Sequence, residues 1–192
     1  MKDTQRLIIF NLILIFCLTA FLKVQADTTG NTALSLKVAP GSLSVEVPPS
    51  AAFVATNFSF AGQTNGGNPI GNIKTTDARG SRSGWGINVT ATDWTDSTGK
   101  VIKHNGDGAN EGRLSLDVPT LGSVARIAGD DTTGITMGED APFTGSTSIK
   151  LITAPANYGS GQYDISGLNA AQFIPGNQPT GNYVTNLTLT IS

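Results

Sequence analysis

The chain has 192 residues, a formal net charge of −2 at pH 7, 14% charged residues and one cysteine. This small acidic excess supplies no basic patch that could neutralise phosphates, so nucleic acid is not an expected partner. The length predicts one domain, and the 23 glycines with few Lys and Glu disfavour long solvent-facing helices.

Residues 1–26 have the pattern of an export signal. Lys2 and Arg6 give a positive start, an apolar run covers 7–22, and the small residues around Ala26 predict cleavage after that position. An uncleaved membrane anchor is the alternative, but the run is short beside the roughly 20 apolar residues that a span needs. We therefore predict a secreted chain with no membrane span in its mature part.

The only cysteine, Cys17, lies inside this signal. The mature chain is thus expected to have no disulfide and no thiol chemistry, and lipid attachment at Cys17 is disfavoured because Phe16 stands where a small residue is required. Residues 27–33 are predicted to be a flexible leader to a domain covering 34–192. About 160 residues can bury an adequate core without disulfides.

Alternating apolar and polar residues then predict a series of short strands. The first three are expected at 34–38, 43–47 and 54–60, with the Gly- and Asn-rich stretch 62–69 as a loop. Strands at 70–76 and from Trp85 to Ala91 follow. Trp94 falls on the opposite face to Trp85 by strict alternation, unless a β-bulge near Thr92 returns it to the same face.

The second half of the chain continues this pattern. Residues 96–112 form a polar excursion with a short strand at 100–103, and the clearest strand runs from Tyr183 to Ile191. Between them we predict a short helical turn at 169–172 and strands at 113–118, 124–128, 146–152, 163–168 and 173–175. Many short strands without an amphipathic helix predict an all-β fold, a single antiparallel β-sandwich.

The sequence predicts a protein that is not an enzyme. His104 is the only histidine and is interpreted as a solvated loop residue, and no G-x-S-x-G elbow is present. Acidic loops around Asp107 and Asp130 do not match a calcium-loop pattern, so they are interpreted as solvated turns. No metal and no cofactor are expected.

The candidate binding residues are aromatic and planar polar side chains, which are the groups that recognise sugars. Ring faces could come from Trp85, Trp94, Tyr158, Tyr163 and Tyr183, while Asp77, Arg79 and several Asn residues could orient hydroxyl groups. For Trp85 the alternative is a core position, and for Asp77 and Arg79 it is an ion pair that stabilises the turn before the Trp85 strand. Both interpretations predict a turn followed by a strand within residues 77–91.

Two segments carry a family resemblance: Asp77-Ala78-Arg79-Gly80 with Gly84-Trp85-Gly86-Ile87, and the final strand 181–191 with Leu187 and Leu189. With the Pro40–Pro48 strand they resemble the WxL-domain surface proteins of bacteria, over about residues 34–191. Ile87 replaces the Leu of the family motif, and Leu189 occupies the position where the family usually has a second Trp. The resemblance implies an exported β domain whose two motifs, here Trp85-x-Ile87 and the Leu187–Leu189 strand, attach to peptidoglycan.

The expected function is therefore non-covalent, non-catalytic association with the bacterial cell wall at the cell surface, with glycan or other surface proteins as partners. The alternative is a structural subunit of an extracellular layer or filament, which would assemble through exposed sheet edges.

Overall fold

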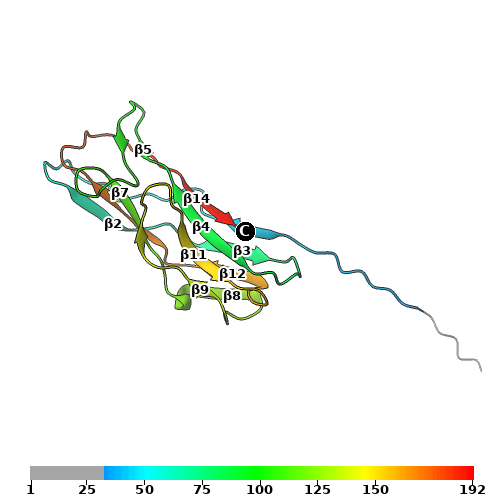
Figure 1. Cartoon of the computed structure of the whole chain (residues 1–192). Helices are drawn as coiled ribbons and strands as arrows, with labels where there is room; N and C mark the ends of the chain where they lie inside the picture. The colour runs from blue at the N-terminus through cyan, green and yellow to red at the C-terminus, as the bar shows by residue number, and fades with distance from the viewer. Residues whose placement is uncertain (1–32) are drawn as a thin grey trace, which may run out of the picture. The chain divides into compact units, whose positions relative to one another are not determined.

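The computed structural model describes residues 33–192 and is built from strands (Figure 1). Within that range it contains no α-helix, only the 3₁₀ turn η1 (Leu121–Ser123). The strands are β1 (Leu43–Glu46), β2 (Gln63–Pro69), β3 (Ile73–Asp77), β4 (Trp85–Ala91), β5 (Trp94–Thr95), β6 (Val101–Ile102), β7 (Arg113–Asp117), β8 (Val124–Gly129), β9 (Thr136–Met137), β10 (Ala141–Pro142), β11 (Ile149–Ala154), β12 (Gly161–Ile165), β13 (Asn169–Ile174) and β14 (Leu187–Ile191).

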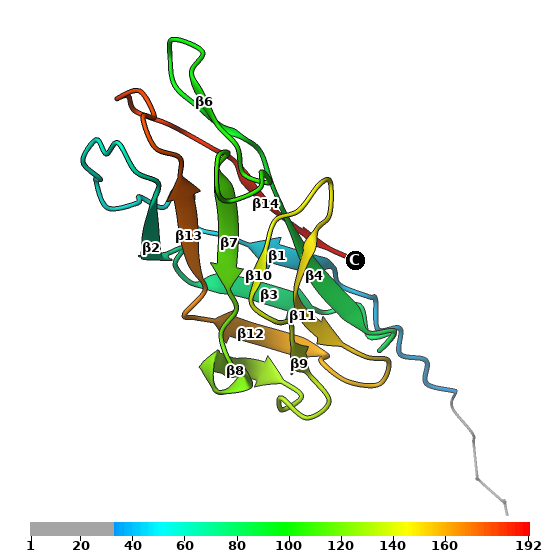
Figure 2. The same ribbon diagram turned by 60° about the vertical axis from the view of Figure 1, so that its left-hand side comes forward.

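The strands pair antiparallel in three four-stranded sheets and one small ribbon. The first sheet has the order β1-β3-β12-β8, the second β10-β7-β13-β2, and the third β14-β4-β11-β9, while β5 and β6 form the ribbon. Figure 2 shows β2, β13 and β7 at one end of the domain and β3, β12 and β8 at the other. The all-β, sandwich-like single domain predicted from the sequence is confirmed.

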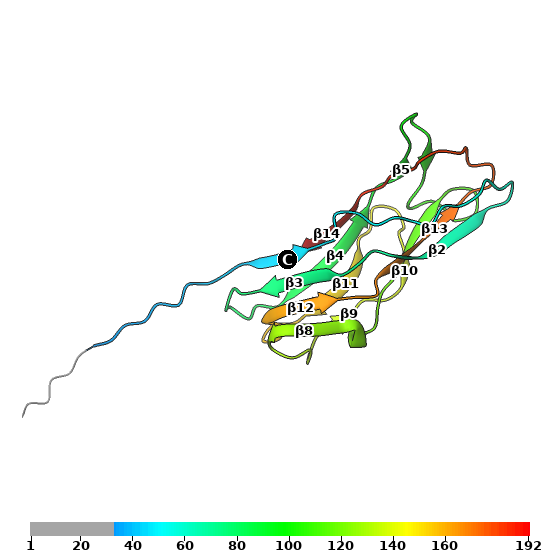
Figure 3. The same cartoon turned by 180° about the vertical axis from the view of Figure 1, so that it is seen from behind.

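The first and second sheets are joined strand by strand. The chain passes from β2 into β3, from β7 into β8 and from β12 into β13 after interruptions of a few residues, and the amide of Ile70 bonds to the carbonyl of Leu168 at 2.9 Å across two of these breaks. The two sheets thus behave as one bent layer. The third sheet packs against this layer, with β14 and β4 beside the first sheet (Figure 3).

The core lies between these layers and follows the alternation of the strands. In β4 the side chains of Trp85, Ile87 and Val89 are buried, and in β12 Tyr163 and Ile165 are buried. Polar residues at the intervening positions face outward, which is the period-2 pattern of a half-buried strand. In the same range no helix is long and apolar enough to cross a membrane.

Two predicted strands are wrong. Residues 34–38 contain no strand, and Leu34 and Leu36 are 94% and 90% exposed, because alternation shows which face a strand could bury but supplies no neighbour to pair with. The compact domain begins at Ala39. Residues 54–60 are also irregular, because amide side chains of β2 take the backbone bonds that a strand would make, as at Val54.

Two other segments are strands against expectation. The predicted loop at 62–69 is β2, and the predicted helical turn at 169–172 belongs to β13. β13 lies between β7 and β2, so both of its edges are paired. This pairing outweighs the weak strand propensity of a stretch rich in Gly, Asn and Ala. The predicted signal 1–26 and nearly all of the leader 27–33 lie outside the described residues.

Candidate functional site

Trp85 and Ile87 are core residues. Trp85 is 3% exposed, its indole Nε1–H donates to the carbonyl of Gly159 at 2.8 Å, and its ring lies 6.1 Å from that of Tyr163. Ile87 is fully buried. Neither side chain presents a face to solvent, so they are left out of the candidate binding site.

Asp77 and Arg79 form an ion pair that fastens a turn. The Arg79 Nε and Nη2 atoms donate to the two Asp77 oxygens at 2.9 and 3.0 Å, and Nη2 also donates to the carbonyl of Gly84 at 2.7 Å. This guanidinium hydrogen bond lowers the pKa of the Asp77 carboxyl, although burial opposes it. The side chains are thus occupied with each other, and the turn-stabilising alternative describes them.

The other predicted aromatic residues, Trp94 and Tyr183, meet at the surface. Together with Phe53 they line two neighbouring hollows, of about 490 and 440 Å³. We call the two hollows the aromatic groove: the first hollow extends toward residues 54–65 and 172–182, and the second extends along 47–52 and 184–189. The predicted residues Leu187 and Leu189, which are half-buried in β14, line the second hollow.

Trp94 is held in place by a buried amide. Its Nε1–H donates to Gln172 Oε1 at 2.8 Å, and Gln172 Nε2 donates in turn to the carbonyls of Lys103 and Phe173 at 3.0 and 2.7 Å. The ring of Phe53 packs edge-on against Trp94, with centroids 4.9 Å apart. Because the indole N–H is already satisfied, the part of the half-buried Trp94 ring that reaches the groove is an apolar face.

Tyr183 is fixed by its hydroxyl group. That hydroxyl donates to the carbonyl of Pro179 at 2.6 Å and accepts from Gln178 Nε2 at 2.8 Å. The ring is therefore pre-positioned beside the first hollow. At its rim, Asn57 and Asn182 carry exposed amide side chains that line the same space.

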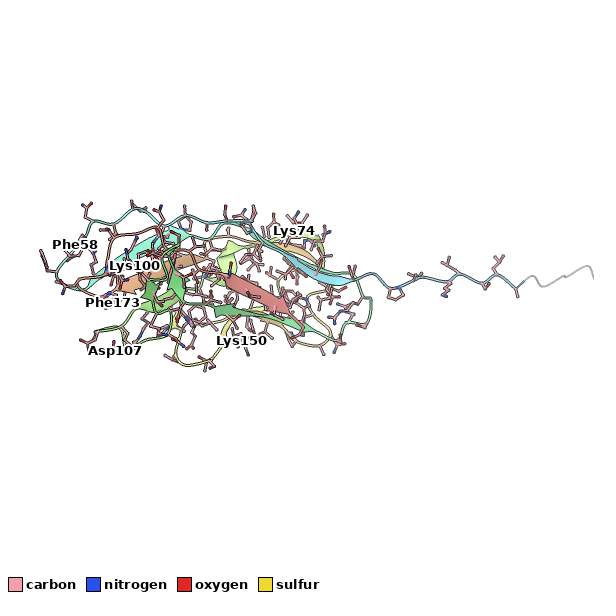
Figure 4. All side chains as sticks on the ribbon, turned by 90° about the horizontal axis from the view of Figure 1, so that it is seen from above. Phe58, Lys74, Lys100, Asp107, Lys150 and Phe173 are labelled. Carbon is pink, nitrogen blue, oxygen red and sulfur yellow. The ribbon has the colours of Figure 1, made fainter. Side chains whose placement is uncertain are left out.

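An extended segment, Val47–Ala61, forms one wall of the groove, and we call it the strap. It has no strand structure and is attached to β2 by side chains: the Val54 amide donates to Asn68 Oδ1 at 2.9 Å, and Asn65 Nδ2 donates to the Val54 carbonyl at 2.6 Å. Figure 4 shows Phe58 of the strap at one end of the domain and Lys74 toward the other.

The lining of the groove contains no Asp, Glu, His, Lys or Arg among the described residues. Its polar groups are amides, hydroxyls and backbone. Such a lining offers no carboxylate pair and no base for acid–base chemistry. The arrangement suits a neutral ligand with both apolar faces and hydroxyl or amide groups.

A titratable cluster is formed by Asp93, which precedes Trp94 in the chain, with Lys103 and His104. His104 Nδ1 lies 2.7 Å from Asp93 Oδ1, and Lys103 Nζ donates to Asp93 at 2.9 Å. Burial alone would raise the pKa of Asp93, but hydrogen bonds from Lys103 and from the amide and ring of His104 lower it to about 2. His104 is only 16% exposed, so its interpretation as a solvated loop residue is wrong.

The acidic loops serve the local fold. Asp107 Oδ1 accepts the backbone amides of Ala109, Asn110 and Glu111 at 2.8 to 2.9 Å, and these bonds, that of Glu111 foremost, hold its pKa well below the usual range. Within residues 33–192, no three His, Cys, Asp or Glu side chains are grouped so that they could hold a metal ion.

Sequence reasoning named Trp94, Tyr183, Leu187 and Leu189 but missed Phe53 and Gln172. Gln172 is 3% exposed, and a glutamine inside a stretch read as a turn gave no signal of burial. In comparisons with protein-family models, curated proteins and solved structures, the chain matches none of them. The WxL-domain resemblance therefore stays a prediction.

Proposed function

We propose that this chain is an exported, non-catalytic surface protein that associates non-covalently with cell-wall glycan through the aromatic groove. The observation that carries the proposal is an uncharged groove in which Trp94 and Tyr183 stand beside amide side chains. The apolar faces of sugar rings pack on aromatic rings, and amides donate to and accept from sugar hydroxyls. The WxL-domain resemblance, with its expected wall address, agrees with this ligand class.

In this proposal the ring faces supply the attraction and the fixed hydrogen bonds supply preorganisation. Gln172 holds Trp94, and Gln178 holds Tyr183, so neither ring needs to be ordered when the ligand arrives. A preorganised site avoids the entropic cost of immobilising side chains, which is about 0.5–1.5 kcal/mol for each one. Asn182 and Asn57 then contact the hydroxyl groups at the rim.

Sedimentation with purified peptidoglycan tests the proposal. The wild-type chain is expected to co-sediment, and Trp94→Ala and Asn182→Ala are expected to weaken binding by roughly tenfold, or about 1.4 kcal/mol. Tyr158→Ala is the matched control, because Tyr158 is an exposed aromatic residue outside the groove lining. A folded wild-type chain that stays in the supernatant would sink the proposal.

Asn182→Ala separates a loss of binding from a loss of stability. Trp94→Ala leaves the buried Gln172 Oε1 atom without a donor and so lowers stability as well as binding. Asn182 is exposed at the rim, and its substitution should leave the thermal unfolding midpoint unchanged. Loss of binding in both variants with Tyr158→Ala unaffected supports the groove; equal binding by all three contradicts it.

A further inference from the structure

The outer edge of β14 is open. β14 ends the third sheet, and on its inner side Ser192 and Gly86 exchange two backbone hydrogen bonds, of 2.9 and 3.1 Å. Antiparallel pairing alternates, so residues 188, 190 and 192 face β4 while the N–H and C=O groups of Leu187, Leu189 and Ile191 face away from it. These outward groups are those to which an added strand would bond.

The space beside this edge has an uncharged lining that includes several apolar side chains. β1 lies next to β14 as the edge strand of the first sheet, yet within residues 33–192 no strand pairing joins the two (Figure 3). Where the strap leads away from β1, the second hollow of the aromatic groove opens, with about 440 Å³ between 47–53 and 183–189. Its lining includes Val47, Phe53, Leu187 and Leu189, and no charged side chain.

The segment Ala33–Val38 has the complementary pattern, and we call it the N-terminal segment. Leu34, Leu36 and Val38 alternate with Ser35 and Lys37, and the three apolar side chains are 94%, 90% and 82% exposed. Large apolar side chains in an exposed extended segment indicate an interaction surface. Lys37 is the only charged residue of the segment. If the segment were paired as a strand, Lys37 would lie on the face opposite the three apolar side chains and would point to solvent.

We propose that the chain assembles with copies of itself by strand addition: the N-terminal segment of one copy bonds to the open edge of β14 in a second copy. Leu34, Leu36 and Val38 then enter the second hollow, and the backbone completes the bonds of Leu187 and Leu189. The contact joins different surfaces of the two copies, so it repeats into open chains. This inference goes beyond glycan binding and does not depend on it, because the rim amides Asn57 and Asn182 proposed to hold the glycan line the first hollow and not the second.

Sedimentation velocity over a concentration series, with the chain beginning at residue 27, tests the assembly. The wild type is expected to form dimers and longer species as concentration rises. Leu36→Lys is expected to raise the concentration needed for association at least tenfold, whereas Ser35→Lys, which adds the same charge on the opposite face, changes it less than twofold. A monomer at every concentration, or equal association of both variants, would overturn the proposal.

Crosslinking locates the contact. In the chain beginning at residue 27, which lacks Cys17, L36C chains are mixed with V184C chains, because Val184 is 66% exposed and lines the second hollow. A disulfide-linked heterodimer is expected, and K150C, on exposed Lys150 of β11, is the control. Equal crosslinking to K150C would overturn the assignment. Both variants used for assembly should sediment with peptidoglycan like the wild type, so failure of either proposal is recognised separately.

Discussion

Replacing Trp85 by Phe should destabilise the fold without touching the ligand site. The substitution removes the 2.8 Å hydrogen bond to Gly159 and leaves a buried carbonyl without a partner, which costs about 1–3 kcal/mol. It also leaves space in a site where the indole is 3% exposed, and full truncation of a buried Trp costs about 3–5 kcal/mol. We therefore expect Trp85→Phe to lower the free energy of unfolding by about 2–4 kcal/mol.

Urea unfolding followed by far-UV circular dichroism measures this change. The midpoint should fall while the slope with denaturant stays the same, since the surface exposed on unfolding is nearly unchanged. Tyr158→Phe, at a 42% exposed aromatic position, serves as the control and should shift the free energy by less than about 0.5 kcal/mol. A Trp85→Phe protein of wild-type stability that no longer binds peptidoglycan would refute the reasoning and return Trp85 to the binding site.

Three further predictions concern the supports of the fold. Gly159→Ala should lower the free energy of unfolding by at least about 2 kcal/mol in the same urea assay, because φ is 72° there and an added Cβ would lie 2.9 Å from Trp85 Nε1. Asp93→Asn should lower the free energy of unfolding by about 1–2 kcal/mol at pH 7. Because the pKa of Asp93 in the folded wild type, about 2, lies below its unfolded value, the difference in unfolding free energy between the two proteins should shrink as the pH falls from 4 through 2. Arg79→Lys should lower the thermal midpoint, since an ammonium cannot make both bonds to the buried Asp77 carboxylate, and an unchanged midpoint would show that the pair contributes nothing.

The strands that were predicted correctly are those whose alternation coincides with burial. In β4 the apolar positions are buried, and along 183–191 the odd positions are half-buried while the even ones are exposed, as the sequence indicated. The sequence predicted a strand at 54–60 and a loop at 62–69, whereas the structure has an irregular strap and the strand β2, and this reversal has a physical reason. The strap has the stronger strand pattern, but β2 has the neighbour, and pairing with β13 decides which of the two becomes a strand.

The site was predictable only in part. Trp94 and Tyr183 stood out because aromatic residues are few in this chain, at 7%. The groove itself depends on the path of the strap and on Gln172, which holds Trp94. Because residues 169–172 were predicted to be a helical turn, the sequence gave no reason to expect Gln172 to be buried. Trp85 attracted attention for the same reason as Trp94. Only the fold separates them, since one ring lies between the layers and the other at their edge.

The pairing of β14 with β4 also bears on when the domain can form. The third sheet joins Leu187 to Ala91 and reaches its last bond at Ser192, so two segments from opposite halves of the chain must meet before this layer exists. Contacts so distant in sequence form late and slowly. Until residues 187–191 have been synthesised, the edge of β4 that they cover has no partner. The third sheet is therefore complete only once residues 187–191 are available to pair with β4.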